Sequence, residues 1–412
     1  NNTSIDYREK APLLAGRNMF LDANGNIIDG LSTLGSLAAG VPGSVAGMLY
    51  ALEKYGTMDR ASILKYAIDI ADTGFVLEER LAAAINSYRK DFDKFFGSKA
   101  IFGQGLNAGE LFIQKELAET LRRIAIEGRD GFYKGKTADE IENYMKMNGG
   151  IITKKDLEIY TAVERKPVHG TYKEYEIFSM PPPSSGGVAL VEMMNIIELV
   201  NLDSVKFNST AYVHLMAEVM RRAFADRAAY IGDPDFNPDM PIGQLISKEF
   251  AKKRFDNIDM TKASVSDSSI YGHPHDGNNT THFSVVDKEG NAVSLTYTLE
   301  YAYGSQMGSN KLGFIFNNEM GDFNPVPGLT TNSGQIGSPA NLIAPEKRML
   351  SSMTPTIVAK NGKPYLIIGS PGGRTIINTV FQTVLNVLGY NMQIDKAIEV
   401  MKIHHQWLPD VL

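Results

Sequence analysis

Threonine hydroxyls are the side chains in this sequence best suited to act as a nucleophile. The chain has 412 residues and no cysteine, which excludes thiolate catalysis, disulfides and Cys-ligated metal sites. No GxSxG elbow marks a serine nucleophile. The segment NNTTHFSVVDKEGNAVSLTYTLE, residues 278–300, instead places threonines at the start of a predicted β-hairpin. By elimination, a threonine is the best candidate nucleophile for acyl transfer, and it needs a base.

Alternating side chains predict the two strands of this hairpin over residues 282–287 and 292–299, joined by a three-residue loop with Gly290 in the left-handed conformation. With Glu289 at the centre of the loop, Thr280 lies opposite Thr298, and their Cβ atoms are about 4.5–5.5 Å apart. One face then carries Thr280, His282, Ser284, Ser294, Thr296, Thr298 and Glu300. The other face carries Phe283, Val285, Val293, Leu295, Tyr297 and Leu299, which we expect in the core. The alternative for the polar face is a solvated outer surface, since Thr is a good strand former.

Composition indicates a globular protein, with 43% hydrophobic and 21% charged residues. We find no linker, charge run or repeat that divides the chain, so residues 1–412 are expected to form a single catalytic domain. The net charge of −6 without a basic cluster argues against nucleic acid as a partner. No apolar run approaches the ~20 residues of a membrane-spanning helix. The chain begins at Asn1 without a signal peptide, so we expect the true N-terminus to be missing.

Helices and strands are predicted in alternating blocks, with a sheet-rich late half, which favours an α+β fold. Helical spacing predicts helices over residues 44–55, 61–72, 110–127, 188–200 and 209–230. Strands are expected over residues 312–316, 356–359 and 365–368. Thr137-Ala-Asp-Glu140 is typical of a capping box before a further helix, and Asn361-Gly362 predicts a hairpin turn.

A glycine pair and two histidine pairs in the sequence are candidate ligand sites. Gly372 and Gly373 precede a predicted helix, where exposed N–H groups form either an oxyanion or phosphate cradle or a simple tight turn. The segment lacks the lysine of a P-loop and the GxGxxG spacing, so no nucleotide cofactor is indicated. His273-Pro-His275 is expected in a flexible loop and His404-His405 in a packed corner, so no metal site is predicted.

Several long motifs, in order, resemble the γ-glutamyltransferases (γ-glutamyl transpeptidases). The resemblance covers the chain from Ile5 to Asp410. It rests on IDYREKAPLLAGRNMFLD, GVPGSVAGM, SMPPPSSGG, TTHFSVVDKEGNAV, NNEMGDF, KRMLSSMTPTIV, GSPGG and HHQWLPD. Members of this family have more sequence before the first and after the last of these motifs. We therefore expect the chain to be a fragment that lacks N- and C-terminal parts.

The resemblance implies an N-terminal-nucleophile hydrolase with a four-layer αββα sandwich. It implies self-cleavage between Asn279 and Thr280, giving a large-subunit portion 1–279 and a small-subunit portion 280–412 that associate as a heterodimer. The new α-amine of Thr280, with a pKa near ~7.7–8, would take the hydroxyl proton, so no histidine base is required. Thr298 would orient the Thr280 hydroxyl.

The resemblance also assigns substrate-binding residues by position. Arg8 matches the arginine that binds the substrate α-carboxylate, and Ser351 and Ser352 match further hydrogen-bonding partners of that group. Glu319 and Asp322 match the acidic pair that holds the α-amino group. Taken singly, these residues could instead be a surface ion pair, turn formers and solvated loop acids.

Gly372 and Gly373 match the oxyanion hole, which agrees with their position before a helix. Two positions depart from the family pattern. Glu300 stands where the family usually has an asparagine that contacts the substrate carboxylate. In the lid loop 327–337, Ser333 aligns best with a tyrosine that often covers the site. We therefore expect an altered donor pocket and a more open site.

The resemblance implies cleavage of γ-glutamyl amides, such as glutathione, through a γ-glutamyl-threonine acyl-enzyme. The acyl group would pass to water, an amino acid or a peptide, without a cofactor. The alternatives are a cephalosporin-acylase-like or poly-γ-glutamate-cleaving amidase of the same fold, and an unprocessed homologue that only binds γ-glutamyl compounds. A periplasmic or extracellular location is also implied.

Overall fold

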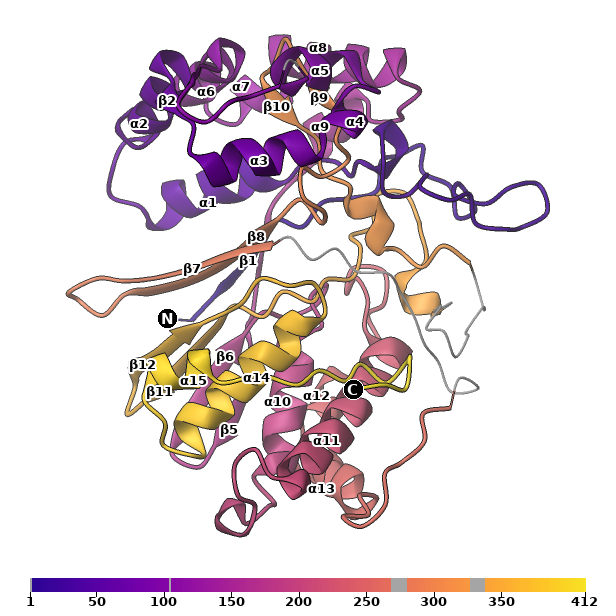
Figure 1. Cartoon of the computed structure of the whole chain (residues 1–412), viewed down its shortest axis with the longest axis vertical. Helices are drawn as coiled ribbons and strands as arrows, with labels where there is room; N and C mark the ends of the chain where they lie inside the picture. Colours follow the sequence, from indigo (N-terminus) through magenta and orange to yellow (C-terminus); the bar gives the residue numbers. More distant parts are fainter. Residues whose placement is uncertain (1, 104, 268–279, 327–337) are drawn as a thin grey trace.

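A four-stranded antiparallel sheet lies in the lower half of the molecule, on the left of the view in Figure 1. The computed structural model describes residues 2–103, 105–267, 280–326 and 338–412. The strand order is β12-β11-β6-β5, with β5 Val168–Tyr172, β6 Tyr175–Ser179, β11 Thr356–Lys360 and β12 Lys363–Ile368. Asn361 and Gly362 join β11 to β12 with φ of 52° and 72°, which confirms the predicted turn. Because β11 pairs with β6, the sheet unites the early and late parts of the chain.

Apolar helices cover the lower side of this sheet (Figure 1). Every residue of α10, Gly186–Ile197, is buried, and α11, Thr210–Tyr230, and α14, Thr375–Leu388, pack beside it in one apolar core with the sheet. Ser209 caps α11 by accepting the Tyr212 N–H at 3.2 Å. The shorter helices here are α12 Ile242–Leu245, α13 Lys248–Asp256 and α15 Ile394–Glu399.

The predicted hairpin forms with the predicted register. Strands β7, Thr280–Val286, and β8, Ala292–Thr298, pair so that Thr280 faces Thr298 and Ser284 faces Ser294. The hydroxyl-bearing face lies against β11 and β12, because Ser284 and Ser294 donate hydrogen bonds to the carbonyls of Ile367 and Ile368 at 3.2 and 3.0 Å. The interpretation of this face as a solvated surface is therefore wrong.

The apolar face of the hairpin is not core along most of its length, contrary to expectation. Phe283, Val285 and Val293 are 47%, 53% and 51% exposed. The base of the hairpin is better covered, since the Tyr297 side chain hydrogen-bonds Ser44 at the start of a helix. Alternation identified the two faces correctly but could not say which of them the sheet covers.

A second group of helices lies above the hairpin and completes the four layers, helix, sheet, hairpin and helix (Figure 1). The larger helices are α1 Ser44–Tyr55, α2 Arg60–Thr73, α6 Lys115–Glu127 and α8 Gly135–Met147. The smaller ones are α3 Glu79–Ser87, α4 Arg89–Phe92, α5 Phe96–Phe102, α7 Asp130–Tyr133 and α9 Lys154–Ile159. The short strand pairs are β1 Ser4–Asp6 with β4 Val163–Arg165, β2 Phe75–Val76 with β3 Leu111–Phe112, and β9 Gly308–Ser309 with β10 Phe314–Ile315. This is the α+β, αββα layering that was expected.

Three local predictions are corrected by the structure. The helix expected from residue 110 begins at Lys115, because Leu111–Phe112 pairs as a strand with Phe75–Val76. Thr137 does not cap a helix; it lies inside α8 and donates to the carbonyl of Gly131 at 2.7 Å. The strand expected over residues 312–316 shrinks to Phe314–Ile315, since Leu312 is part of a turn that closes on Ser309.

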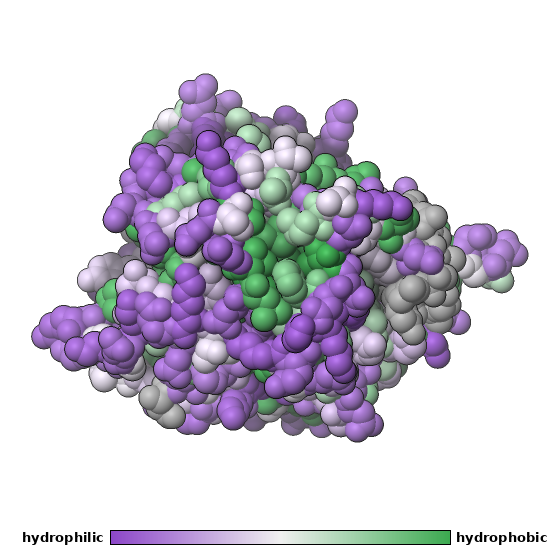
Figure 2. All heavy atoms as spheres, turned by 90° about the horizontal axis from the view of Figure 1, so that it is seen from below, coloured by the Kyte–Doolittle hydropathy of each residue, from purple (hydrophilic) through white to green (hydrophobic). Residues whose placement is uncertain are grey.

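The lower end of the molecule has a mostly hydrophilic surface, with a group of apolar side chains near its middle (Figure 2). Within the described residues, no helix combines the length and apolar character that crossing a membrane requires. At the end of the chain, His405 is 2% exposed and bonds Asp410 at 3.1 Å through Nε2. His404 bonds Asn378 at 2.8 Å through Nδ1, so this pair forms the predicted packed corner.

Candidate active site

The candidate nucleophile lies at the first residue of β7, where the hairpin register brings two hydroxyls together. The Thr280 hydroxyl donates to Thr298 Oγ1 at 3.3 Å, and Thr298 Oγ1 also accepts the N–H of Glu300 at 2.9 Å. Thr298 is therefore held from its C-terminal side while it contacts Thr280. Asn279, and with it the expected cleavage point, lies outside the described residues.

Polar contacts along the same face hold the hairpin against the sheet. The His282 ring bonds Thr296 Oγ1 at 2.9 Å and Ser284 Oγ at 3.1 Å. Ser294 Oγ accepts the N–H of Thr356, the first residue of β11, at 3.0 Å. Burial lowers the pKa of His282, so the ring is neutral at pH 7. These contacts position Thr280 through its strand and leave His282 committed to its neighbours on that face.

The glycine pair follows the strand that supports the nucleophile. The His282 ring occupies the space above Gly369, where a Cβ would come within 2.2 Å of it, so the end of β12 runs toward Thr280. Gly372 and Gly373 then turn the chain with φ of 120° and 56°, values that strain residues with a side chain. The helix α14 begins only at Thr375, so the glycines form the turn before the helix and not its first residues.

The N–H groups of this turn remain available to a ligand. The Gly372 carbonyl accepts from the Thr375 N–H at 3.1 Å and from Thr375 Oγ1 at 2.6 Å, and the Gly373 carbonyl accepts from Ile376 N–H at 3.2 Å. Within residues 2–103, 105–267, 280–326 and 338–412, neither glycine N–H donates a hydrogen bond. The turn thus has the donors that an oxyanion hole needs.

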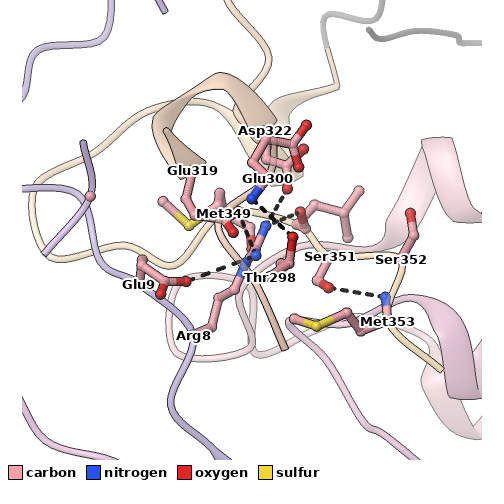
Figure 3. A network of polar contacts seen from close by, with 12 residues as sticks. Arg8, Glu9, Thr298, Glu300, Glu319, Asp322, Met349, Ser351, Ser352 and Met353 are labelled. Carbon is pink, nitrogen blue, oxygen red and sulfur yellow. Dashed lines mark hydrogen bonds and ion pairs between the residues drawn. The ribbon is translucent and has the colours of Figure 1, made fainter. Parts of the chain in front are cut away.

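Arg8 lies at the centre of a buried acidic cluster (Figure 3). Its side chain is shielded from solvent, its Nη1 contacts Glu319 Oε2 at 2.6 Å, and its Nη2 contacts Asp322 Oδ2. Glu319 and Asp322 lie on one turn of 3-10 helix, where residues three apart point the same way. The readings of Arg8 as a surface ion pair and of Glu319 as a solvated acid are both wrong, because Arg8 is 6% and Glu319 0% exposed.

Electrostatics within the cluster are dominated by burial and by Arg8. Burial raises the pKa of Glu319 well above its usual value, the positive charge of Arg8 opposes the rise, and the neighbouring carboxylates add to it. Burial likewise raises the pKa of Glu9 to about 6, against the effect of Arg8. For Arg8 itself, burial lowers the pKa, but Glu319 and Asp322 outweigh it and raise the pKa.

Glu300 joins this cluster as a third carboxylate. It is 9% exposed, and one of its carboxylate oxygens lies within 4.8 Å of those of Glu319 and Asp322. Its φ is 77°, after β8 has ended at Thr298, so strand alternation does not set its direction. It lies next to Asp322 in the cluster (Figure 3). Three such carboxylates could hold a cation, but the positive charge already beside them is that of Arg8.

The serine pair lies on the chain that passes Arg8. The carbonyls of Met349 and Leu350 accept from the Arg8 guanidinium at 3.4 and 3.3 Å, and Ser351 and Ser352 follow directly. Ser351 Oγ accepts the N–H of Met353 at 3.1 Å, as drawn in Figure 3. The structure therefore brings the serines next to the acidic cluster, and their described side chains do not bond Arg8 directly.

Sequence reasoning missed residues that hold the site together from behind. Asn341 is 1% exposed; it donates to the Asp322 carbonyl at 2.7 Å and accepts the Leu350 N–H at 2.9 Å. Arg227 of α11 donates to Ser352 Oγ at 2.9 Å. Neither residue stands in a motif with local chemical character, and only the long-range contacts reveal them.

Two predicted features cannot be placed. The lid loop 327–337 with Ser333 lies outside the described residues, and so does the His273-Pro-His275 pair. The described part of the site consists of Thr280, Thr298, the glycine turn, the serine pair and the Arg8 cluster.

Comparison with known proteins identifies the family of this chain. The gamma-glutamyltranspeptidase family model matches residues 1–412. The chain belongs to the γ-glutamyltranspeptidase family. It is 46% identical over 413 residues to a glutathione hydrolase proenzyme of Pseudomonas sp. (strain A14), covering 99% of this chain and 72% of the relative.

Solved structures and a second class of relatives agree with the family assignment. The γ-glutamyltranspeptidase of Helicobacter pylori superposes with a TM-score of 0.62 at 45% identity, covering 64% of this chain and 76% of that one. An acylase ACY 1 proenzyme of Pseudomonas sp. (strain SE83) is less similar, with 35% identity over 378 residues, which cover 91% of this chain and 65% of the relative. The family is thus shared with acylases, and the glutathione hydrolases are nearer in sequence.

Proposed function

We propose that this chain carries the catalytic site of a γ-glutamyltransferase/hydrolase, which cleaves γ-glutamyl amides such as glutathione and passes the acyl group to water, an amino acid or a peptide. Thr280 is the nucleophile, released as an N-terminal residue by cleavage after Asn279. Its α-amine takes the hydroxyl proton as the hydroxyl oxygen attacks the γ-carbonyl, and it gives this proton to the amine that leaves when the C–N bond breaks and the γ-glutamyl-threonine ester forms. Thr298 orients the hydroxyl, and the N–H groups of Gly372 and Gly373 stabilise the oxyanion.

The observation that carries this proposal is the continuity between nucleophile and acidic cluster. Thr280 contacts Thr298, Thr298 accepts the Glu300 N–H, and the Glu300 carboxylate lies beside Glu319 and Asp322. The donor α-ammonium binds to Glu319 and Asp322, and its α-carboxylate binds to Arg8, Ser351 and Ser352. The γ-carbonyl then lies toward Thr280, several bonds from the zwitterionic end.

The acidic cluster also favours a γ-glutamyl donor over the acyl groups of a cephalosporin-acylase-like enzyme. A donor that has no α-amino group would leave the buried Glu319 Oε1, which has no hydrogen-bond partner among the described residues, still without a donor, and such a carboxylate is costly. Poly-γ-glutamate presents the same γ-amide bond, so it remains a second candidate donor.

Self-cleavage tests the nucleophile. The full-length protein should give two fragments on a denaturing gel, and the smaller should begin at Thr280 by N-terminal sequencing. Thr280→Ala should stay as one chain. Thr281→Ala is the matched control, because Thr281 pairs with Tyr297 on the opposite face and should leave cleavage after Asn279 intact. An uncut wild-type chain that still turns over a γ-glutamyl amide would refute the mechanism.

A donor panel tests the substrate class. We expect turnover of glutathione and γ-glutamyl anilides, and much lower kcat/KM for a glutaryl amide, which has neither the α-amino nor the α-carboxylate group. A preference for the glutaryl amide would favour the acylase alternative, and a processed but inactive protein that binds glutamate would favour a binding role. The two fragments should co-purify as a heterodimer. The periplasmic or extracellular location belongs to the same proposal and is tested by cell fractionation.

A further inference from the structure

A buried arginine of α11 connects the PPPSSGG loop to the serine pair. Arg227 is 6% exposed; its Nε donates to Ser185 Oγ at 2.8 Å and its Nη2 donates to Ser352 Oγ at 2.9 Å. Ser185 Oγ in turn donates to the carbonyl of Ser351 at 2.7 Å. One guanidinium thus holds the backbone of one serine, through Ser185, and the side chain of the other.

These contacts determine whether the serine hydroxyls can donate hydrogen bonds to a ligand. A hydroxyl has one hydrogen, so an oxygen that accepts from an N–H keeps its own hydrogen for another acceptor. Ser352 Oγ accepts from Arg227, and Ser351 Oγ accepts from the Met353 N–H at 3.1 Å (Figure 3). Neither hydroxyl donates to another group within the part of the chain that the structure describes, so both hydrogens are available there to a ligand. A carboxylate, which only accepts, is the matching ligand.

The backbone around the pair is fixed to keep this geometry. The Ser185 N–H donates to the Ser351 carbonyl at 2.9 Å, and Ser184 Oγ donates to the Met353 carbonyl at 2.6 Å. Gly186 begins α10 so close to this turn that a Cβ there would lie 2.2 Å from Thr354 Oγ1. The loop and the serine turn therefore form one packed unit, with Arg227 behind it.

We propose that Arg227 is a positioning residue that makes Ser352 a hydrogen-bond donor to the α-carboxylate of the donor substrate. Its charge also strengthens the bond, since a hydroxyl that accepts from a cation is a better donor. The inference rests on the proposed function, because it takes the bound group to be the donor carboxylate. It assigns no contact between Arg227 and the substrate.

A purely structural role for Arg227 makes a different prediction. Its guanidinium lies 5.9 Å from the centre of the Phe224 ring and could simply stabilise the end of α11. Loss of such packing would lower activity on every donor alike. Loss of the orienting bond affects only donors whose α-carboxylate accepts from Ser352.

The test compares a γ-glutamyl anilide with its decarboxylated analogue, a 4-aminobutanoyl anilide, which offers Ser352 no acceptor because its α-carboxylate is absent. Arg227→Gln should raise KM for the carboxylate donor about tenfold, with kcat and the kinetics of the decarboxylated donor changed less than about twofold. Arg222→Gln is the matched control: Arg222 is on the same helix, is 9% exposed and pairs with Glu218 at 2.6 Å, remote from the serines. It should leave the ratio of kcat/KM for the two donors unchanged.

A double-mutant cycle completes the test. In a Ser352→Ala background, Arg227→Gln should have almost no further effect on that ratio, since the hydroxyl it orients is gone. Additive effects, or an equal loss on both donors, would overturn the positioning role. If Arg227→Gln fails to mature, Arg227→Lys should still shift the ratio, because one ammonium does not replace a two-armed guanidinium; an unchanged ratio overturns the proposal. A wild-type protein that turns over neither donor would instead refute the proposed function.

Discussion

Asp6 and Arg8 lie two residues apart, yet they belong to buried charge clusters of opposite character. The Asp6 carboxylate is fully buried between two guanidiniums, with Oδ2 2.8 Å from Arg165 Nε and 3.3 Å from Arg348 Nε. Its Oδ1 accepts the N–H of Arg8 at 3.0 Å. Around Arg8 the ratio of positive to negative groups is reversed, because one guanidinium lies beside the carboxylates of Glu300, Glu319 and Asp322.

The difference separates a cluster that holds the fold from one that can still take a ligand. Both Asp6 oxygens have donors within the protein. By contrast, Glu319 Oε1 has no hydrogen-bond partner among the described residues, although the side chain is fully buried. A buried carboxylate oxygen without a hydrogen-bond donor lowers stability, and an ammonium ligand can supply that donor. The Asp6 cluster also fixes the backbone from which Arg8 extends.

The largest expected effect is on stability, from breaking the Asp6 cluster. Asp6→Asn leaves the buried guanidinium of Arg348 and the partly buried one of Arg165 facing a neutral group, and it should lower the free energy of unfolding by about 3–5 kcal/mol. Asp235→Asn is the control, because Asp235 also pairs with Arg165, at 2.8 Å, but its side chain is 50% exposed. It should cost at most about 1 kcal/mol. Equal losses in thermal or denaturant unfolding would show that the two carboxylates are not distinguished by burial.

Removing the cation of the second cluster should affect binding more than maturation. Arg8→Ala should still give two fragments but raise KM for γ-glutamyl donors about 100-fold, or ~2.7 kcal/mol, as a charge-assisted contact to the donor carboxylate is lost. Arg8→Lys should recover part of the loss, since its ammonium keeps the charge but not the fork. Unchanged steady-state kinetics for Arg8→Ala would show that Arg8 does not contact the substrate.

Glu300→Asn removes one carboxylate from the Arg8 cluster. The resemblance implies an asparagine at the position of Glu300, and an ionised carboxylate there repels the donor carboxylate instead of donating to it. Glu300→Asn should raise kcat/KM for γ-glutamyl anilides about tenfold, or ~1.4 kcal/mol. If the substitution destroys activity, Glu300 is a necessary ligand of the donor, most simply of its α-ammonium.

The hairpin shows how far sequence alone could lead. Strict alternation and a glycine loop determined the register, so the Thr280–Thr298 contact was predictable. Which face would be covered was not, because that depends on β11 and β12, more than fifty residues further along the chain. The exposure of Phe283 and the partial burial of the hydroxyl face, most complete at Thr296, follow from that packing.

The sequence predicted which charged residues belong to the site but not how they are arranged. Resemblance named Arg8, Glu319 and Asp322, and the structure brings them together. Nothing local in the sequence indicates that Arg227 reaches Ser352, or that Asn341 ties Asp322 to Leu350, since both contacts join distant elements. The capping-box prediction at Thr137 also failed, because the helix already begins at Gly135 and the Thr137 hydroxyl donates to the Gly131 carbonyl of the preceding helix.

The smallest expected effect is on the pH dependence of stability and of donor binding, which favour opposite protonation states of Glu319. Because burial raises the pKa of Glu319 above its value in the unfolded chain, its contribution to stability is fully present at low pH and is lost as pH rises through the raised pKa. Binding of the donor α-ammonium has the opposite requirement, since it needs the ionised carboxylate. Glu319→Gln should therefore raise the melting temperature slightly at neutral pH and weaken donor binding there.

The pH profile of KM measures this directly. In the wild type, KM for a γ-glutamyl anilide should rise as pH falls through the raised pKa of Glu319, and in Glu319→Gln this dependence should flatten. Asp235→Asn, which changes a carboxylate outside the cluster, should keep the wild-type profile. A Glu319→Gln protein with the wild-type profile would mean that another member of the cluster, such as Glu9 with its pKa raised to about 6 by burial, controls donor binding.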